Sequence, residues 1–172
     1  MKPGEFTNRG NGIIVCRNLE EIKSIVKNKK KLENGGMRTY IVQEYIDRPF
    51  LYCKRKFDIR HFMLITCVNG HMKGYWYKHG YIRTTSYEYS VKNSFNSVHL
   101  TNDAVQKQLP DYGKYEKGNK ISYDEFERYL EVQLGGKYSF YQTIYPQMKL
   151  IAKDSMRASA NLLDEDRKGH NF

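Results

Sequence analysis

Charged side chains alternate with apolar ones along RKFDIR, residues 55–60. Lys56, Asp58 and Arg60 alternate with Phe57 and Ile59, and side chains two apart on a strand project from the same face. The segment continues as the apolar HFMLITCV, which favours a central strand, and charges there need a cavity or partners. A pocket for phosphate and metal would supply both. The alternative is a solvated edge with a local ion pair.

The start of the chain offers a second candidate site for phosphate. Lys2 precedes a flexible segment with Arg9, Gly10 and Gly12, and such a loop can cover phosphates with backbone donors and cations. The spacings of the P-loop and of the dinucleotide-binding loop are absent. By itself the segment therefore favours an ordinary loop.

Further polar residues lie downstream, at Arg83 and in the segment HLTNDAVQK, residues 99–107. Thr101 or Asn102 could simply cap a helix that begins near Asp103. A single histidine such as His99 is more often packed or solvated than catalytic. None of these residues indicates catalysis when it is taken alone.

The elements that must position these groups begin with a strand and a helix. Residues 13–15 are apolar and follow the glycine loop, which predicts a strand. Asn18 and Glu21 have the spacing of a capping box. Apolar residues at helical spacing over 19–26 predict a helix that ends before the lysines at 29–31.

The middle of the chain has the pattern of antiparallel strands. Residues 40–46 predict a buried strand. Residues 57–68 and the aromatic segment 75–77 flank an Asn-Gly turn signal, which predicts a packed hairpin. A further strand is expected over 81–84.

The last third is predicted to be mostly helical, after a loop over 86–97. Ser122 and Glu125 form a second capping box, and the helix that follows should stop at Gly135. A final helix is expected over 142–163. The predicted fold class is therefore α+β with largely antiparallel strands.

Composition limits the classes of protein. The 172 residues can bury one core, and the net charge of +10 implies a polyanionic partner. No apolar run approaches the ~20 residues that cross a bilayer, so we expect a cytosolic protein that does not contact a membrane. The three cysteines, Cys16, Cys53 and Cys67, indicate neither a disulfide framework nor a zinc cluster.

Five separated segments together resemble the tubulin-tyrosine ligase family. They are KPGE…RGNGI, VQEYI-x-x-P, KFDIR, YIRT and HLTN…VQK, in this order and over essentially the whole chain. The resemblance implies an ATP-grasp fold that is incomplete here. Residues 1–47 would be the remainder of the central lobe with the interlobe segment, and residues 48–172 a truncated C-terminal lobe.

The resemblance also implies roles for single residues. Lys2 would contact phosphate, and the loop Arg9, Gly10 and Gly12 would cover the phosphates; Gln43, Glu44, Tyr45 and Ile46 would hold adenine; Lys56, Asp58 and Arg60 would line the ATP and acceptor side; Thr101 and Asn102 would lie near the ribose. Arg60 and Arg83 would be the catalytic cations, with Arg83 near the γ-phosphate. His99 would only shape its turn.

The implied reaction forms an amide in two steps. A carboxylate of an acidic C-terminal tail of tubulin attacks the γ-phosphate of ATP to give an acylphosphate, and the amine of a free amino acid then displaces phosphate. Tyrosine, glutamate and glycine all remain open as the transferred amino acid, although DYGKYEKGN, residues 111–119, is closer to the tyrosine ligase. Such a protein is expected in the cytoplasm, at microtubules or cilia.

The same resemblance places the magnesium ligands outside this chain. The family carries an acidic residue and a Glu-x-Asn motif on a strand expected beyond Phe172, and its N-terminal lobe is expected before Met1. The acidic residues 164–166 are better explained as a solvated helix end. We therefore expect no metal ligands here, weak ATP binding and little or no catalysis by this piece alone.

Two other functions remain open from the sequence. One is a non-catalytic remnant that binds tubulin or nucleotide. The other is a basic module that binds nucleic acid, since cations and aromatic residues are plentiful. The second is less favoured, because residues 75–77 have the pattern of strand packing and no RNA-binding motif is present.

Overall fold

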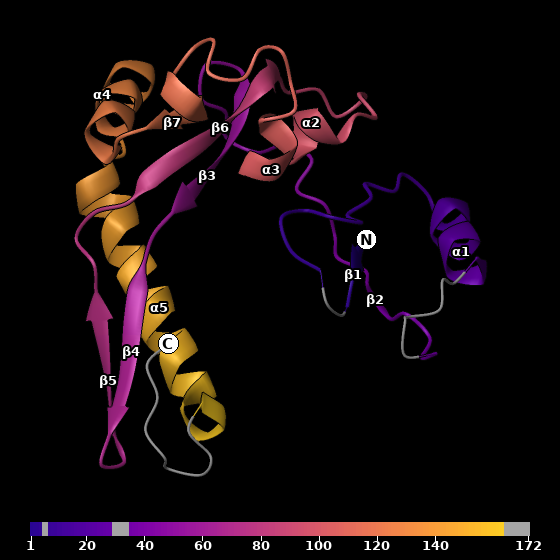
Figure 1. The fold of residues 1–172 in the computed structure, drawn as a ribbon. Coiled ribbons are helices and arrows are strands. Elements are labelled where there is room, and N and C mark those ends of the chain that lie inside the picture. The colour runs from indigo at the N-terminus through magenta and orange to yellow at the C-terminus, as the bar shows by residue number, and fades with distance from the viewer. Residues whose placement is uncertain (5–6, 29–34, 164–172) are drawn as a thin grey trace. The chain divides into compact units, whose positions relative to one another are not determined.

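The computed structural model describes residues 1–4, 7–28 and 35–163 (Figure 1). The chain forms two compact units, one of residues 1–58 with 83–119 and one of residues 59–82 with 120–172. Helices and antiparallel strands are mixed, so the α+β class is confirmed. The lobe boundary expected after residue 47 stays a prediction.

Two strands run from one unit into the other. They are β3 (Arg55–Arg60) and β6 (Tyr81–Glu88), and with β7 (Lys120–Ile121) they form a sheet in the order β3-β6-β7. The predicted RKFDIR strand is thus confirmed, but the expectation that it is a central strand was wrong, because β3 lies at the edge of this sheet among the described residues. The predicted strand over 81–84 is four residues longer than expected, which shortens the predicted loop after it.

The remaining elements of the first unit are short. They are β1 (Lys2–Pro3), α1 (Leu19–Lys27), β2 (Tyr40–Ile41), α2 (Asn96–His99), α3 (Asp103–Gln106) and a 3₁₀ turn (Lys117–Asn119).

Helix α1 begins at the predicted capping box. The Asn18 side chain accepts a hydrogen bond from the Glu21 backbone N–H at 2.9 Å, and the Glu21 carboxylate accepts one from the Arg17 N–H at 2.9 Å. These bonds satisfy amide groups that a helix start leaves without partners. The predicted helix over 19–26 is confirmed. The lysine run at 29–31, before which it was expected to end, lies outside the described residues.

Two strand predictions in the first unit were wrong. Residues 13–15 form no strand, and the strand expected over 40–46 is confined to β2, where Lys2 pairs with Ile41 and Pro3 with Tyr40. Ile46 is 72% exposed rather than buried. Apolar residues do not form a strand without a partner backbone, and β1 offers β2 only two residues.

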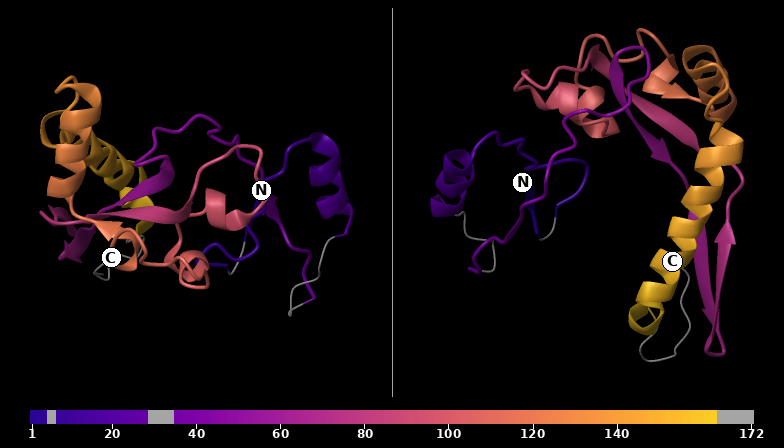
Figure 2. Two further views of the ribbon diagram at one scale, coloured as in Figure 1. Left: turned by 90° about the horizontal axis from the view of Figure 1, so that it is seen from above. Right: turned by 180° about the vertical axis from the view of Figure 1, so that it is seen from behind.

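The second unit contains a hairpin, two helices and one π-turn. Its elements are β4 (Met63–Val68), β5 (His71–Trp76), β7, α4 (Tyr123–Leu134), the π-turn (Phe140–Ile144) and α5 (Tyr145–Leu163). Figure 2 shows α5 running alongside the hairpin.

The predicted hairpin is confirmed, with one correction. Asn69 and Gly70 have φ values of 51° and 74°, as the turn that matches the twist of two antiparallel strands requires. Residues 61–62, however, belong to no strand. The apolar run over 57–68 is therefore divided between β3 and β4, which lie in different sheets. Of the aromatic segment, Tyr75 is 51% and Tyr77 57% exposed, so the packing expected for it holds only in part.

Both predicted helices of the second unit are present. Ser122 accepts the Glu125 N–H at 3.1 Å, and Gly135 ends α4 with a left-handed φ of 57°. The buried core of this unit includes Phe126, Leu130 and Phe140, each no more than 2% exposed. No helix in the described part of the chain has the length and apolar character that a membrane span requires.

Gly80 lies against a hydrogen bond in which the Tyr123 hydroxyl donates to the Arg60 carbonyl oxygen at 2.9 Å. A Cβ at this position would lie 2.3 Å from the Arg60 carbonyl oxygen and 2.1 Å from the Tyr123 hydroxyl. At Gly74 in β5 a Cβ would meet the Met156 sulfur at 2.7 Å, and that flexible side chain can move.

We predict that Gly80→Ala lowers the free energy of unfolding by about 2 kcal/mol or more, because a backbone carbonyl must shift. Gly74→Ala, the matched control, should cost about 1 kcal/mol or less. Urea unfolding monitored by circular dichroism measures both variants. Equal losses for the two would contradict this account of Gly80.

Candidate functional site

The first unit brings Lys2 next to Gln43. The Lys2 ammonium donates a hydrogen bond to the Gln43 side-chain oxygen at 2.6 Å, and both side chains are exposed. They are held together because β1, which carries Lys2, pairs with β2 just before Gln43. A cation predicted to contact phosphate and a residue predicted to hold adenine are thus neighbours.

The glycine loop lies against Asn102. Arg9, Gly10 and Gly12 all have positive φ values, of 57°, 85° and 72°. The two glycines adopt such a backbone without strain. A Cβ on Gly10 would lie 3.2 Å from the Asn102 side chain. The loop predicted to cover phosphates therefore lies close to a residue predicted to lie near the ribose.

Lys56 lies over aromatic rings. Its ammonium is 4.4 Å from the centre of the Tyr45 ring and donates to the Tyr45 hydroxyl at 3.0 Å. Burial lowers the pKa of Lys56. Burial also raises the pKa of the Tyr45 phenol, and Tyr89 adds to this rise. The phenol therefore keeps its proton at neutral pH.

Asp58 and Arg83 form a two-pronged ion pair. The Arg83 guanidinium donates from Nε to one Asp58 oxygen at 2.8 Å and from Nη2 to the other at 2.6 Å. The fork geometry that fits a carboxylate here also fits a phosphate. Asp58 thus holds Arg83 in an orientation suited to an anion.

The remaining candidate residues differ in how far they are exposed to solvent. Arg60 belongs to the second unit and is exposed, with its guanidinium 5.8 Å from the Phe62 ring. Glu44 and Ile46 are exposed, and Thr101 is half-buried. His99 is 3% exposed, and its Nδ1 lies 2.7 Å from the Tyr45 hydroxyl.

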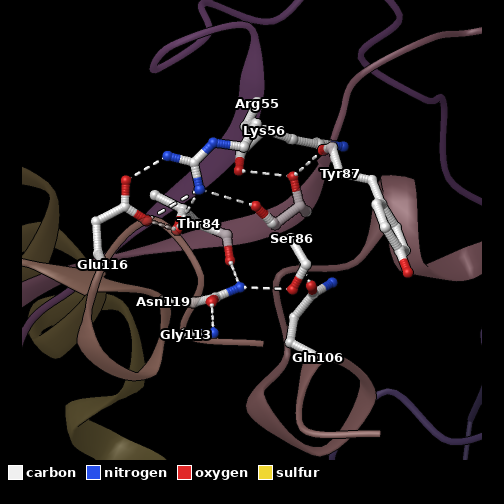
Figure 3. A network of polar contacts seen from close by, with 10 residues as sticks. Arg55, Lys56, Thr84, Ser86, Tyr87, Gln106, Gly113, Glu116 and Asn119 are labelled. Atoms are coloured by element: carbon white, nitrogen blue, oxygen red, sulfur yellow. Dashed lines mark hydrogen bonds and ion pairs between the residues drawn. The ribbon is translucent and has the colours of Figure 1, made fainter. Parts of the chain in front are cut away.

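A buried ion pair that the sequence analysis missed lies behind the predicted site (Figure 3). Arg55 is 3% exposed and forms a bidentate pair with Glu116, one prong of which is 2.9 Å long. Arg55 also donates to the Thr84 hydroxyl at 3.3 Å and to the Thr85 carbonyl at 3.1 Å. The charges are therefore surrounded by hydrogen bonds, as burial demands.

Two buried amides extend this network along β6. Asn119 donates to the Thr84 carbonyl at 3.1 Å and to the Ser86 hydroxyl at 2.9 Å. Gln106 accepts from the Ser86 N–H at 2.7 Å and donates to the Ser97 and Leu100 carbonyls at 2.9 and 2.7 Å. The segments 97–106 and 113–119 are thereby fastened to β6.

One sequence signal could have revealed the ion pair. Arg55 is adjacent to Lys56 on a strand, so the two side chains take opposite faces. A strand with charges on both faces and aromatic and apolar neighbours needs a partner on each side. Nothing local to Glu116, 61 residues away, identifies it as that partner.

The structure groups no metal ligands in the part of the chain that it describes. No cluster of three or more His, Cys, Asp or Glu side chains suited to a metal ion occurs among these residues. The acidic residues 164–166 lie outside them.

The whole chain, residues 1–172, matches the model of the tubulin-tyrosine ligase family. Tubulin glycylase 3B of Drosophila melanogaster is 35% identical over 136 residues, which are 77% of this chain and 17% of that protein. Tubulin glycylase 3A of the same species is 36% identical over 160 residues, or 91% and 15%. Human tubulin monoglycylase TTLL3 is 33% identical over 153 residues, or 87% and 19%. The chain thus spans less than a fifth of each of these relatives.

Removing one partner of the buried pair should be costly. We predict that Glu116→Ala lowers the free energy of unfolding by about 3 kcal/mol or more, because Arg55 is left charged and buried. The double variant Arg55→Met, Glu116→Leu should recover much of that loss. Urea unfolding measures both.

The matched control is Glu20→Gln, which breaks the exposed Glu20–Lys23 pair of α1. It should change the free energy of unfolding by about 0.5 kcal/mol or less. A loss at Glu116 as small as this would contradict the structural role of the buried pair.

Proposed function

Because this chain belongs to the tubulin-tyrosine ligase family, we propose that it forms part of the ATP site of a ligase that adds an amino acid to the acidic C-terminal tails of tubulin. The site would lie on an ATP-grasp fold, and the protein would act in the cytoplasm at microtubules or cilia. The proposal concerns a complete ligase, because the match to this chain covers only 15% of the length of tubulin glycylase 3A.

The observation that carries the proposal is that predicted site residues pair with one another. Three hydrogen-bonded pairs and one close approach each join two of them, and three of the four join segments far apart in the sequence. The pairs are Lys2 with Gln43, Gly10 with Asn102, Tyr45 with Lys56, and Asp58 with Arg83. A set of residues without a common role would not be expected to pair in this way.

The chemistry of these residues fits a nucleoside triphosphate. Lys2, Lys56 and Arg83 supply cations, and the glycine loop supplies backbone N–H groups at left-handed positions. Bound ATP would supply the phosphoryl group that activates the acceptor carboxylate. The protein's task is to neutralise and align negative groups that repel one another.

Arg83 and Arg60 are the cations proposed for that task. An arginine stays charged and can bind phosphate or carboxylate with two parallel hydrogen bonds. Arg83 already makes such a pair with Asp58, so an incoming phosphate would compete with that carboxylate. Arg60 is exposed and is therefore accessible to a ligand or to an acidic tail.

Magnesium does not fit the described residues, since no carboxylate cluster is present among them. We therefore propose that carboxylates outside the described residues would hold the ion, which would neutralise phosphate charge there. Hard cations on ATP need such oxygen ligands.

We propose glycine as the transferred amino acid, on the strength of relatives that are named tubulin glycylases. The likeness of the segment 111–119 to the tyrosine ligase favours tyrosine instead. Two of its polar residues, Glu116 and Asn119, are bonded inside the protein.

Two alternative functions are each supported by a specific observation. The family resemblance is equally compatible with a non-catalytic remnant that binds nucleotide or tubulin, since metal ligands are absent from the described residues. The exposed Tyr75 and Tyr77, with the charge of +10, would suit a module that binds single-stranded nucleic acid. Salt-sensitive binding to single-stranded RNA, stronger than to tubulin-tail peptides, would favour that module.

We predict that Arg60→Ala in the complete protein lowers ligation by about 100-fold or more, because a cation that aligns negative groups is lost. The assay offers labelled glycine, glutamate and tyrosine separately with ATP, magnesium and tubulin, and glycine should be incorporated preferentially. The fold of the variant should be intact by circular dichroism. The chain of 172 residues alone should show weak ATP binding and little or no ligation.

The matched control is Arg48→Ala, whose side chain is 94% exposed and, among the residues that the structure describes, forms one long ion pair, with Asp47 at 3.7 Å. It should retain ligation within about twofold. Wild-type turnover by folded Arg60→Ala would refute the role of Arg60, and no ligation by the wild-type complete protein would favour the non-catalytic alternative.

A further inference from the structure

The Lys56 ammonium is held by aromatic residues. It lies 4.4 Å from the centre of the Tyr45 ring and 5.8 Å from that of Tyr89. Within the described part of the chain no carboxylate forms an ion pair with it. Its position among the described residues therefore depends on the two rings and on its hydrogen bond to the Tyr45 hydroxyl, at 3.0 Å.

His99 determines the direction of that hydrogen bond. Its Nε2 lies 2.6 Å from the Asn93 carbonyl oxygen, which can only accept, so Nε2 carries the hydrogen. In the neutral ring Nδ1 is then an acceptor, and it lies 2.7 Å from the Tyr45 hydroxyl. Tyr45 donates its only hydrogen to His99, which leaves its oxygen free to accept from Lys56.

The relay, which we define as Asn93, His99, Tyr45 and Lys56, is packed around His99. His99 is 3% exposed, and its ring meets those of Tyr45 and Tyr89 edge-on at 5.4 and 5.9 Å. The relay joins the segment 43–46, the strand β3 and the HLTN segment. These are three of the segments to which the proposed function assigns nucleotide contacts.

We propose that His99 is a positioning residue of the nucleotide site: by accepting the Tyr45 hydroxyl hydrogen it orients the oxygen that holds the Lys56 ammonium toward a bound nucleotide. The inference rests on the proposed function for its ligand and on the structure for the relay. His99 itself would touch neither the nucleotide nor the acceptor.

Two substitutions of His99 separate its two hydrogen bonds, the one that it accepts from Tyr45 and the one that it donates to Asn93. His99→Asn keeps an acceptor near the position of Nδ1, so Tyr45 can still donate. His99→Gln keeps a donor near the position of Nε2 for Asn93 but removes the acceptor for Tyr45. Tyr45→Phe removes only the hydroxyl, and His71→Gln, at an exposed position of β5, is the matched control.

The first measurement follows the lysine side chain directly. The full chain is labelled with ¹³C,¹⁵N-lysine, and the Lys56 signal is assigned by its loss in Lys56→Gln. We expect His99→Gln and Tyr45→Phe to move this signal toward those of exposed lysines, and His99→Asn and His71→Gln to leave it near its wild-type position. Circular dichroism verifies that each variant is folded.

The second measurement is the dissociation constant for ADP, by titration of the same variants. His99→Gln and Tyr45→Phe should each raise it about fivefold, the loss expected for one hydrogen bond of about 1 kcal/mol. His99→Asn should remain within about twofold of wild type. A role in folding alone would not separate His99→Asn from His99→Gln in this way.

The outcomes distinguish the relay from the site. An unchanged Lys56 signal in folded His99→Gln overturns the relay. A moved signal with unchanged ADP affinity overturns the role of His99 in positioning for nucleotide. If the wild-type chain binds no ADP while the Lys56 signals behave as expected, the nucleotide site fails in this chain and the relay stands.

Discussion

The ion pair between Arg55 and Glu116 is the interaction on which the first unit depends. It joins β3 to the segment 113–119, and the Thr84 hydroxyl and Thr85 carbonyl of β6 complete its hydrogen bonds. A buried charge without its partner costs several kcal/mol, so neither side chain can leave without disrupting the other. The pair therefore selects one arrangement of these three segments.

The proposed site uses the opposite face of the same strand. Because side chains alternate along β3, the strand that turns Arg55 inward turns Lys56 and Asp58 toward Tyr45 and Arg83. Gln106 fastens the HLTN segment to β6 from within. Side chains that bind a ligand are precisely placed only when buried contacts hold their backbone. The buried hydrogen-bond network of Arg55, Glu116, Asn119 and Gln106 supplies such contacts for the proposed site.

The helix ends and the hairpin turn could be predicted because their causes are local. The capping boxes at Asn18 and Ser122 and the turn at Asn69 and Gly70 each depend on a few adjacent residues. The strands over 13–15 and 40–46 could not be predicted correctly, since a strand exists only where a second backbone pairs with it. The interruption of the apolar run at residues 61–62 likewise depends on which sheet each half joins.

The sequence by itself determined the family, the α+β class and the residue types of the candidate site, because these follow from motifs and from local patterns of polarity. Only the tertiary structure decided which of those residues meet: Lys2 with Gln43, Asp58 with Arg83, and Tyr45 with both Lys56 and His99. It also revealed Glu116 as the buried partner of Arg55, the first residue of RKFDIR. Such pairings join positions far apart in the chain, and the folding of the intervening segments, which no local pattern encodes, brings them together.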